Sequence, residues 1–116
     1  MKRILVIDDD EDILSIVSSL LQFHGFEVKT YSTGFNVSNV VVDYDPNLIL
    51  MDIKLPGKLG TEVCKELKQS YSHLPIILFS AHAQKEQAIA ICQADDFIKK
   101  PFDIKDLIGT INSHLN

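Results

Sequence analysis

Five polar residues in this sequence each stand where a short apolar run ends, and their types can do chemistry together. They are Asp8, Asp9, Asp52, Ser80 and Lys100. In an open sheet of parallel strands, ligands bind beyond the carboxyl ends of the strands. If the apolar runs are strands of such a sheet, three carboxylates, a hydroxyl and an ammonium group meet at one end of it.

This set of groups is suited to metal-assisted phosphoryl transfer. Converging carboxylates repel one another unless a hard cation lies between them, and Mg²⁺ binds one or two carboxylates together with waters and a phosphoryl oxygen. A carboxylate can also accept a phosphoryl group and form an acyl phosphate. A lysine and a hydroxyl can then hold the phosphoryl oxygens as charge moves. The residue types therefore predict phosphoryl transfer onto an aspartate.

The apolar runs before these residues are typical of buried parallel strands. Ile4–Ile7, Leu48–Met51 and Ile76–Phe79 are nearly continuous rather than alternating, as expected for strands that are covered on both faces. Glu27–Tyr31 and Asp96–Lys99 are weaker strand candidates. We therefore expect five strands.

Apolar residues at helical spacing separate the strand candidates. Such stripes cover residues 13–24 and 104–115, and Asp103 is the expected N-cap of the second. The Ala- and Ile-rich segment 84–93 also favours a helix, whereas the valines and Asn/Ser residues of 35–45 favour only a short or irregular one. Strands that alternate with helices predict a doubly wound α/β fold with a mostly parallel sheet and right-handed crossovers.

Length and composition exclude several classes of protein. The 116 residues are expected to form one domain, 1–116, and 46% hydrophobic residues allow a core without disulfides. The net charge of -5 argues against a sequence-independent nucleic-acid binder. No apolar run approaches the roughly 18 residues of a membrane span. Two cysteines without a CxxC spacing favour a reducing, cytoplasmic location.

The acidic charge has a local origin. Five of the 16 acids form the run Asp8–Asp12, and the remaining acids equal the 11 Lys and Arg residues in number. A charged loop that caps a helix is one interpretation of this run, because acids are favoured at helix N-termini. It explains Asp10 to Asp12 better than it explains Asp8 and Asp9, which directly follow a strand.

Four separated motifs resemble those of the response-regulator receiver domain. They are Ile4–Asp9, Leu48–Gly57 with Gly60, Ile76–Ala81 and Asp95–Phe102. They occur in the order of that family and cover essentially the whole chain. The resemblance implies a flavodoxin-like fold with strand order 2-1-3-4-5. It also implies a role in two-component phosphorelay signalling, with a histidine kinase or a histidine phosphotransfer protein as the phosphoryl donor.

The resemblance also assigns roles to the acidic residues. By it, Asp52 is the phospho-acceptor. Asp9, Asp52 and the backbone carbonyl of Lys54 would hold Mg²⁺, and Asp8 would act on the ion through water or directly.

Further roles follow from the same resemblance. Ser80, in place of the commoner Thr, would bond a phosphoryl oxygen, and Lys100 would pair first with Asp52 and then with the phosphate. Phe97 would be the aromatic residue whose rotamer follows Ser80 and alters a partner-binding surface. The Lys100–Pro101 peptide bond is implied to be cis.

The chain departs from the family pattern in one region. From Ser80 to Lys100 it is two residues shorter than most members, and Gln93 stands where a Gly usually precedes Ala-Asp. We therefore expect that the helix in 84–93, or the loop before it, is truncated or reoriented.

Two variable positions are expected to influence the lifetime of the acyl phosphate. Lys54 lies two residues after Asp52, and His82 lies two residues after Ser80. In the family that the chain resembles, the residues at both positions vary together with the lifetime of the acyl phosphate. We expect Lys54 or His82 to tune hydrolysis by steering or excluding the attacking water.

Three alternatives are weighed against the receiver interpretation. An aspartyl-phosphate hydrolase needs a second Asp two residues after its nucleophile, where this chain has Lys54. A flavodoxin-like cofactor binder needs a Ser/Thr/Gly-rich loop in place of Asp8–Asp12, and a pseudo-receiver scaffold would lack an acid or the lysine. The favoured interpretation is a signalling domain with only intrinsic autophosphorylation and autodephosphorylation activity. Its effector is not identified, and it is expected to be a monomer or a phosphorylation-dependent homodimer.

Overall fold

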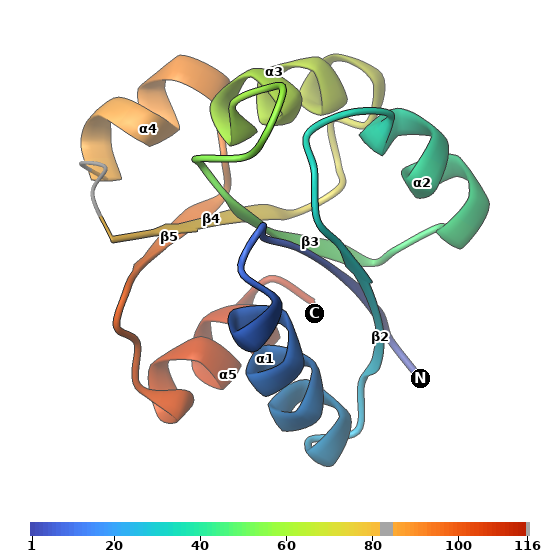
Figure 1. Cartoon of the computed structure of the whole chain (residues 1–116), viewed down its shortest axis with the longest axis vertical. Coiled ribbons are helices and arrows are strands. Elements are labelled where there is room, and N and C mark those ends of the chain that lie inside the picture. The colour runs from blue at the N-terminus through green and yellow to red at the C-terminus, as the bar shows by residue number, and fades with distance from the viewer. Residues whose placement is uncertain (82–84, 116) are drawn as a thin grey trace.

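The computed structural model describes residues 1–81 and 85–115, and it places a five-stranded sheet between two layers of helices (Figure 1). The strands are β1 (Arg3–Ile7), β2 (Glu27–Tyr31), β3 (Leu48–Asp52), β4 (Ile76–Ser80) and β5 (Asp96–Lys99). The helices are α1 (Glu11–Phe23), α2 (Val37–Tyr44), α3 (Gly60–Ser70), α4 (Lys85–Cys92) and α5 (Ile104–Ser113). The strand order is β2-β1-β3-β4-β5, and every neighbouring pair is parallel. This confirms the predicted fold class and strand order.

Burial explains why the three central strands were easy to recognise. Every residue of β3 and β4 is buried, and so are four of the five residues of β1. A strand covered on both faces gains from apolar residues at every position, which produces continuous runs. The edge strand β2 is mostly exposed, so its polar sequence carries a weaker signal. Asp52 and Ser80 are the last residues of their strands rather than the first residues after them.

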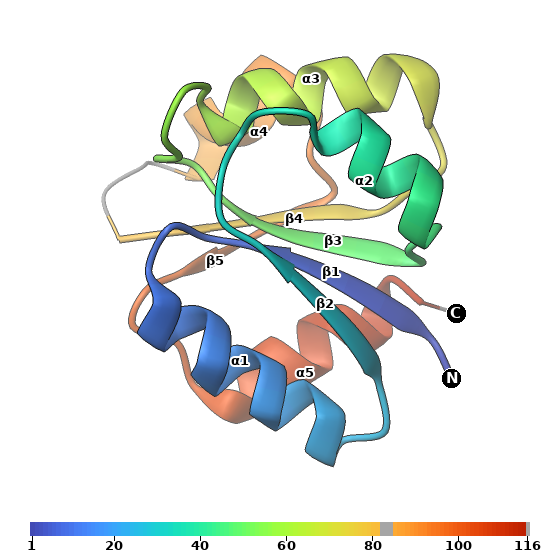
Figure 2. The ribbon, with the colours of Figure 1, turned by 45° about the vertical axis from the view of Figure 1, so that its right-hand side comes forward.

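The sheet separates two cores. Helices α1 and α5 cover one face, and α2, α3 and α4 cover the other (Figure 2). Within β1, Ile4 and Val6 belong to the core under α1 and α5, whereas Leu5 and Ile7 belong to the opposite core. This alternation follows from the two-residue period of a strand, and it gives each helical layer its own set of β1 side chains.

Helices α1 and α5 each begin after an aspartate whose side chain caps the helix, as the sequence indicated. The Asp10 side chain accepts hydrogen bonds from the backbone N–H groups of Asp12 and Ile13, so part of the acidic run does cap α1. Asp103 caps α5, as predicted. The short helix expected in 35–45 is α2, which has eight residues and begins after the left-handed Asn36 without a side-chain cap.

Helix α4 is also short, with eight residues. It ends before Gln93, which adopts a positive φ of 60°. That left-handed conformation favours glycine, the residue that the family pattern places there. Among residues 1–81 and 85–115, no helix is long and apolar enough to cross a bilayer.

Candidate functional site

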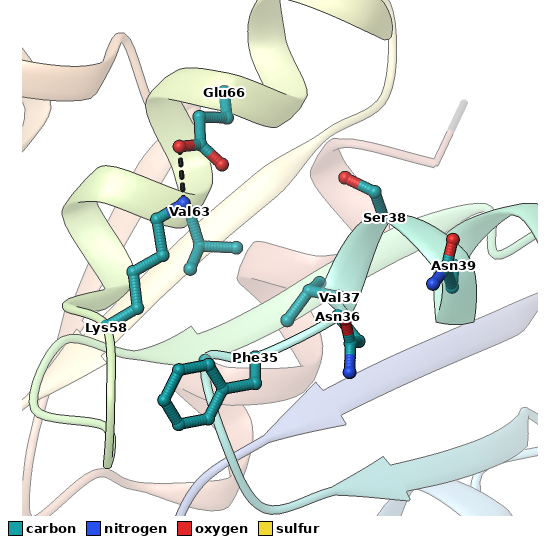
Figure 3. A pocket seen from close by; sticks show the side chains of 9 residues that line it. Phe35, Asn36, Val37, Ser38, Asn39, Lys58, Val63 and Glu66 are labelled. Carbon is teal, nitrogen blue, oxygen red and sulfur yellow. Dashed lines mark hydrogen bonds and ion pairs between the residues drawn. The ribbon is translucent and has the colours of Figure 1, made fainter.

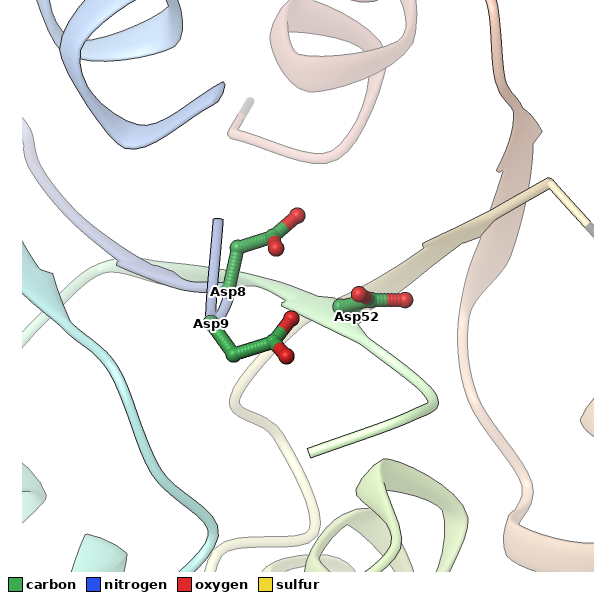
Figure 4. Close-up of side chains that lie close together, drawn as sticks. All are labelled: Asp8, Asp9 and Asp52. Atoms are coloured by element: carbon green, nitrogen blue, oxygen red, sulfur yellow. The ribbon is translucent and has the colours of Figure 1, made fainter. Parts of the chain in front are cut away.

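Three carboxylates converge at the carboxyl end of the sheet. Asp8 follows β1, Asp9 comes next in the chain, and Asp52 ends β3. One oxygen from each side chain lies within 4.8 Å of the other two (Figure 4). Asp8 is fully buried, Asp52 is 9% exposed, and Asp9 is exposed to solvent. The group is therefore a partly desolvated acidic cluster that is open on the Asp9 side.

The neighbourhood of the cluster explains its shape. β1 and β3 are adjacent parallel strands, and Ile7 pairs in register with Met51, so the residues that follow both strands lie side by side. The Asp8 carboxylate accepts a hydrogen bond from the backbone N–H of Asp10 at 2.9 Å. The Asp52 carboxylate accepts one from the N–H of Ile53 at 2.7 Å. Both acids are held by the backbone that leaves their own strand.

Lys100 supplies the positive charge of the site. Its Nζ lies 2.7 Å from Asp8 Oδ2 and 3.5 Å from Asp52 Oδ2. The predicted pairing with Asp52 is therefore present, but the shorter contact is to Asp8. The backbone N–H of Lys100 donates to the Ser80 carbonyl at 3.0 Å, which ties the lysine to the end of β4. The Lys100–Pro101 bond is cis, as the resemblance implied.

The acidic cluster carries more negative charge than Lys100 can balance. The pKa of Asp52 is raised above the usual carboxyl value, first because burial disfavours the charged form and second because Asp8 repels it. Lys100 and the backbone N–H groups of Ile53 and Lys54 oppose this rise. Three hard oxygen ligands with an excess of negative charge fit a divalent cation such as Mg²⁺.

Ser80 and Phe97 lie in β4 and β5, at the positions that the sequence predicted. Ser80 is 3% exposed at the end of β4, and it pairs in register with the exposed Lys99. Phe97 is 9% exposed and packs in the core under α2, α3 and α4. Its buried ring stands on the face of the sheet that carries α4.

Of the two residues predicted to tune hydrolysis, the structure describes only Lys54. Lys54 is exposed in the β3–α3 loop, residues 53–59, two positions beyond Asp52. His82, predicted together with Lys54 to tune hydrolysis, lies outside the described residues.

Sequence reasoning missed one residue that contacts the site. The ring of Phe79 lies under the Lys100 ammonium group, with 4.4 Å between Nζ and the ring centroid. Such a cation–π contact helps to hold a lysine side chain in place. The sequence marks Phe79 only as a buried strand residue, and no spacing rule relates it to a lysine that follows another strand.

Comparisons with known proteins agree with this geometry. The family model of the response regulator receiver domain matches residues 4–112. Regulatory protein AtoC of Escherichia coli K12 is 32% identical over 109 residues, which are 92% of this chain and 24% of AtoC. The chain thus spans about a quarter of that relative's length.

Solved structures show the same architecture. A CheY-like receiver domain from Methanospirillum hungatei superposes with a TM-score of 0.92 at 32% identity, covering 99% of this chain and 94% of that one. The BeF3-activated N-terminal receiver domain of Klebsiella pneumoniae RstA gives a TM-score of 0.93 at 25% identity, covering 99% of each chain. With the family match, the parallel sheet and the acidic cluster together, this chain belongs to the response regulator receiver domain family, the signalling modules of two-component systems.

Proposed function

We propose that this domain accepts a phosphoryl group on Asp52 in a Mg²⁺-dependent reaction and thereby switches a partner-binding surface. The observation that carries the proposal is the convergence of three carboxylates within 4.8 Å of one another, two of which pair with a single lysine. Receiver domains bind Mg²⁺ at an acidic pocket and interact with histidine kinases and effector domains. The proposed donor is accordingly a histidine kinase or a histidine phosphotransfer protein.

The proposed metal ligands are Asp8, Asp9, Asp52 and the backbone carbonyl of Lys54. When bound, Mg²⁺ offsets the charge of the carboxylates and of the incoming phosphoryl oxygens. The pKa of Asp52 is raised first by burial and second by repulsion from Asp8, so the carboxylate form is disfavoured in the absence of such an ion. This supports a cation requirement, because the attacking group must be the carboxylate.

In the proposed reaction, a carboxylate oxygen of Asp52 attacks the phosphorus of a phosphohistidine. The new O–P bond forms as the N–P bond breaks, and the imidazole leaves with that electron pair. Lys100 Nζ, which lies 3.5 Å from Asp52 Oδ2, then shifts to the phosphoryl oxygens, and the Ser80 hydroxyl donates to another of them. Intrinsic autophosphorylation from small donors and slow autodephosphorylation would use the same groups.

The proposed output passes through Ser80 and Phe97. Both are buried, so a movement of the Ser80 hydroxyl toward the phosphoryl group would leave space for the Phe97 ring. That ring packs in the core that also contains Ala88 and Cys92 of α4. A change in its rotamer would therefore alter the surface near α4, for an effector that remains to be identified.

The acyl phosphate's lifetime is proposed to depend on Lys54, which is exposed and lies two residues after the acceptor. Its long side chain can cover the approach of water to the phosphorus atom. Equal dephosphorylation rates in the wild type and Lys54→Ala would contradict this.

The remaining proposals concern the chain as a whole. We propose that residues 1–116 act as one receiver unit in the cytoplasm, without direct binding of nucleic acid or membrane. We also propose a monomer that dimerises, if at all, after phosphorylation.

The central experiment measures one added phosphoryl group by intact mass. The protein is incubated with Mg²⁺ and acetyl phosphate, alongside Asp52→Asn and, as a matched control, Asp45→Asn. Asp45 is an exposed aspartate at the other end of the sheet. We expect a single adduct on the wild type and on Asp45→Asn, none on Asp52→Asn, and none in excess EDTA. An equal adduct on Asp52→Asn, or no adduct on the wild type, would overturn the proposal.

The same experiment separates the alternatives. A pseudo-receiver scaffold gives no adduct at all, and an aspartyl-phosphate hydrolase turns over the donor many times without accumulating one. The second is not favoured, because Lys54 stands where such an enzyme carries its second Asp.

A further inference from the structure

Two loops at the carboxyl end of the sheet are in close contact, although the strands that they follow are not neighbours in the sheet. They are the β2–α2 loop, residues 32–36, and the β3–α3 loop, residues 53–59. The backbone N–H of Gly34 donates to the carbonyl of Pro56 at 3.2 Å. Gly34 also lies so close to Lys58 that a Cβ atom at position 34 would be 2.4 Å from the Lys58 carbonyl oxygen. The sheet does not require this contact, because β2 and β3 both pair with β1 and not with each other.

Phe35 lies over the middle of the β3–α3 loop. Its ring covers Gly57 so closely that a Cβ atom at position 57 would lie 1.9 Å from the ring. Gly57 has a φ of +82°, so both its backbone conformation and the ring above it favour glycine. The remaining surface of the ring is open, because Phe35 is 56% exposed. Figure 3 shows the ring beside Lys58, at one end of a pocket of about 310 Å³ between the start of α2 and α3.

The backbone of Phe35 is itself anchored. The Tyr31 hydroxyl donates to the Phe35 carbonyl at 2.7 Å, and the Phe35 N–H donates to the Thr33 hydroxyl at 3.2 Å. Tyr31 is the last residue of β2 and pairs in register with Ile7 of β1. The backbone of Phe35 is therefore attached to a strand of the sheet by the Tyr31 hydrogen bond and held within its own loop by the Thr33 hydrogen bond.

The base of the β3–α3 loop is fixed by a different contact. The Gly60 N–H donates to the Ile53 carbonyl at 2.7 Å, and a Cβ atom at position 60 would lie 2.1 Å from the Asp52 carbonyl oxygen. The loop is thus closed at its base by Gly60 and covered in its middle by Phe35. Lys54, whose carbonyl is a proposed metal ligand, lies between these two points of support.

We propose that Phe35 is a positioning residue for the Mg²⁺ site and acts through the Phe35–Gly57 contact. This inference rests on the proposed function, because it takes the Lys54 carbonyl as a metal ligand. A backbone carbonyl binds an ion well only if its loop is ordered before binding, since ordering the loop at that moment costs conformational entropy. Phe35 orders the loop in advance and so raises the affinity for Mg²⁺.

An exposed phenylalanine is by itself ordinary, because folded proteins expose much apolar surface. Phe23, at the end of α1, is 86% exposed and serves as the matched control. What distinguishes Phe35 is the bare glycine backbone beneath its ring. Removal of either ring takes away the same apolar group, but only one of them covers the loop that carries Lys54.

The test compares Phe35→Ala with Phe23→Ala by two measurements on the unphosphorylated protein. Calorimetric titration with MgCl₂ gives the Mg²⁺ Kd, and amide hydrogen exchange without metal gives the protection of the Gly34 N–H. For Phe35→Ala we expect a Kd raised by about tenfold, the usual scale for loss of a group that supports a metal ligand, and faster exchange at Gly34. Phe23→Ala should match the wild type in both. Phe35→Tyr keeps the ring and should restore both values.

The outcomes are distinguishable. A wild type that does not bind Mg²⁺ overturns the proposed function and this inference with it. A wild type that binds Mg²⁺, with an unchanged Kd in Phe35→Ala, overturns the inference alone. An equal loss of affinity in Phe23→Ala also overturns it. If Phe35→Ala does not fold, Phe35→Leu takes its place, because leucine keeps part of the cover over Gly57. The Mg²⁺ Kd of Phe35→Leu must then be higher than that of Phe35→Tyr, and equal values overturn the inference.

Discussion

The two ends of the sheet each carry an ion pair between distant parts of the chain, and the pairs differ in their surroundings. At the carboxyl end, Lys100 Nζ lies 2.7 Å from Asp8 Oδ2, and the two side chains are 16% and 1% exposed. At the amino end, Arg3 lies 3.3 Å from Asp45 Oδ2, with side chains 39% and 87% exposed. The first pair has a second carboxylate beside it, Asp52.

The difference between the pairs indicates that the carboxyl end is not arranged for stability alone. Water screens the Arg3–Asp45 pair, and such pairs contribute little to folding. Burial of Asp8 and Asp52 costs solvation free energy that one lysine offsets only in part. An arrangement that folding alone would not favour, with an excess of negative charge, is expected where a cation or a phosphoryl group is bound.

The largest effect on stability is expected from removal of the lysine. Lys100→Met leaves Asp8 buried without its partner, which should lower the free energy of unfolding by about 3–5 kcal/mol in EDTA. Lys99→Met, on the exposed neighbour, should change it by less than about 0.5 kcal/mol. Urea unfolding of both variants measures the difference. A loss in Lys100→Met as small as that in Lys99→Met would contradict the assignment of Lys100 as the needed partner of a buried carboxylate.

A smaller effect is expected from the glycine that closes the β3–α3 loop. In Gly60→Ala the new Cβ would meet the Asp52 carbonyl oxygen at 2.1 Å, so the loop must shift, at a cost of about 1–3 kcal/mol. Gly109→Ala is the control, because Gly109 is exposed in α5 and has nothing within 4 Å. It should stabilise the protein by up to about 1 kcal/mol, through helix propensity. Thermal unfolding gives the Tm of both variants. A Tm below that of the wild type in both would contradict this assignment.

The charge of Asp52 should itself destabilise the metal-free fold. Because its pKa is raised in the folded state, the folded protein takes up a proton before the unfolded chain as the pH falls. At neutral pH, Asp52→Asn should therefore be the more stable protein, by about 1 kcal/mol. The gap should close as the pH falls through the raised pKa toward the ordinary carboxyl range. Urea unfolding in EDTA between about pH 4 and about pH 8, a range that starts near the ordinary carboxyl pKa, measures this difference in stability. A difference that stays constant with pH would contradict the electrostatic cause.

The smallest effect is expected at the amino end. Arg3→Ala removes an exposed ion pair and should cost less than about 1 kcal/mol, with a further decrease of that cost in high salt. Urea unfolding at low and high NaCl measures both. A loss as large as that in Lys100→Met would remove the contrast between the two ends.

Much of the fold was predictable because burial leaves a direct trace in the sequence. The central strands are continuous apolar runs, and the runs predicted at Ile4–Ile7, Leu48–Met51 and Ile76–Phe79 each fall within one residue of the observed strand. The residues that end these runs were predicted to meet, and the acids do meet, since parallel strands deliver their carboxyl ends to one place. The short helix in 35–45 followed from its valines and its Asn and Ser residues.

What the sequence determined by itself is the order of elements, the composition of the site and the helix caps, because each depends on a residue and its near neighbours. The tertiary structure alone decided that Lys100 lies closer to Asp8 than to Asp52 and that Phe79 lies beneath it. It alone placed the ring of Phe35 on Gly57. These contacts join residues far apart in the chain, and their distances depend on the twist of the sheet and on loop packing, which no local pattern of residues encodes.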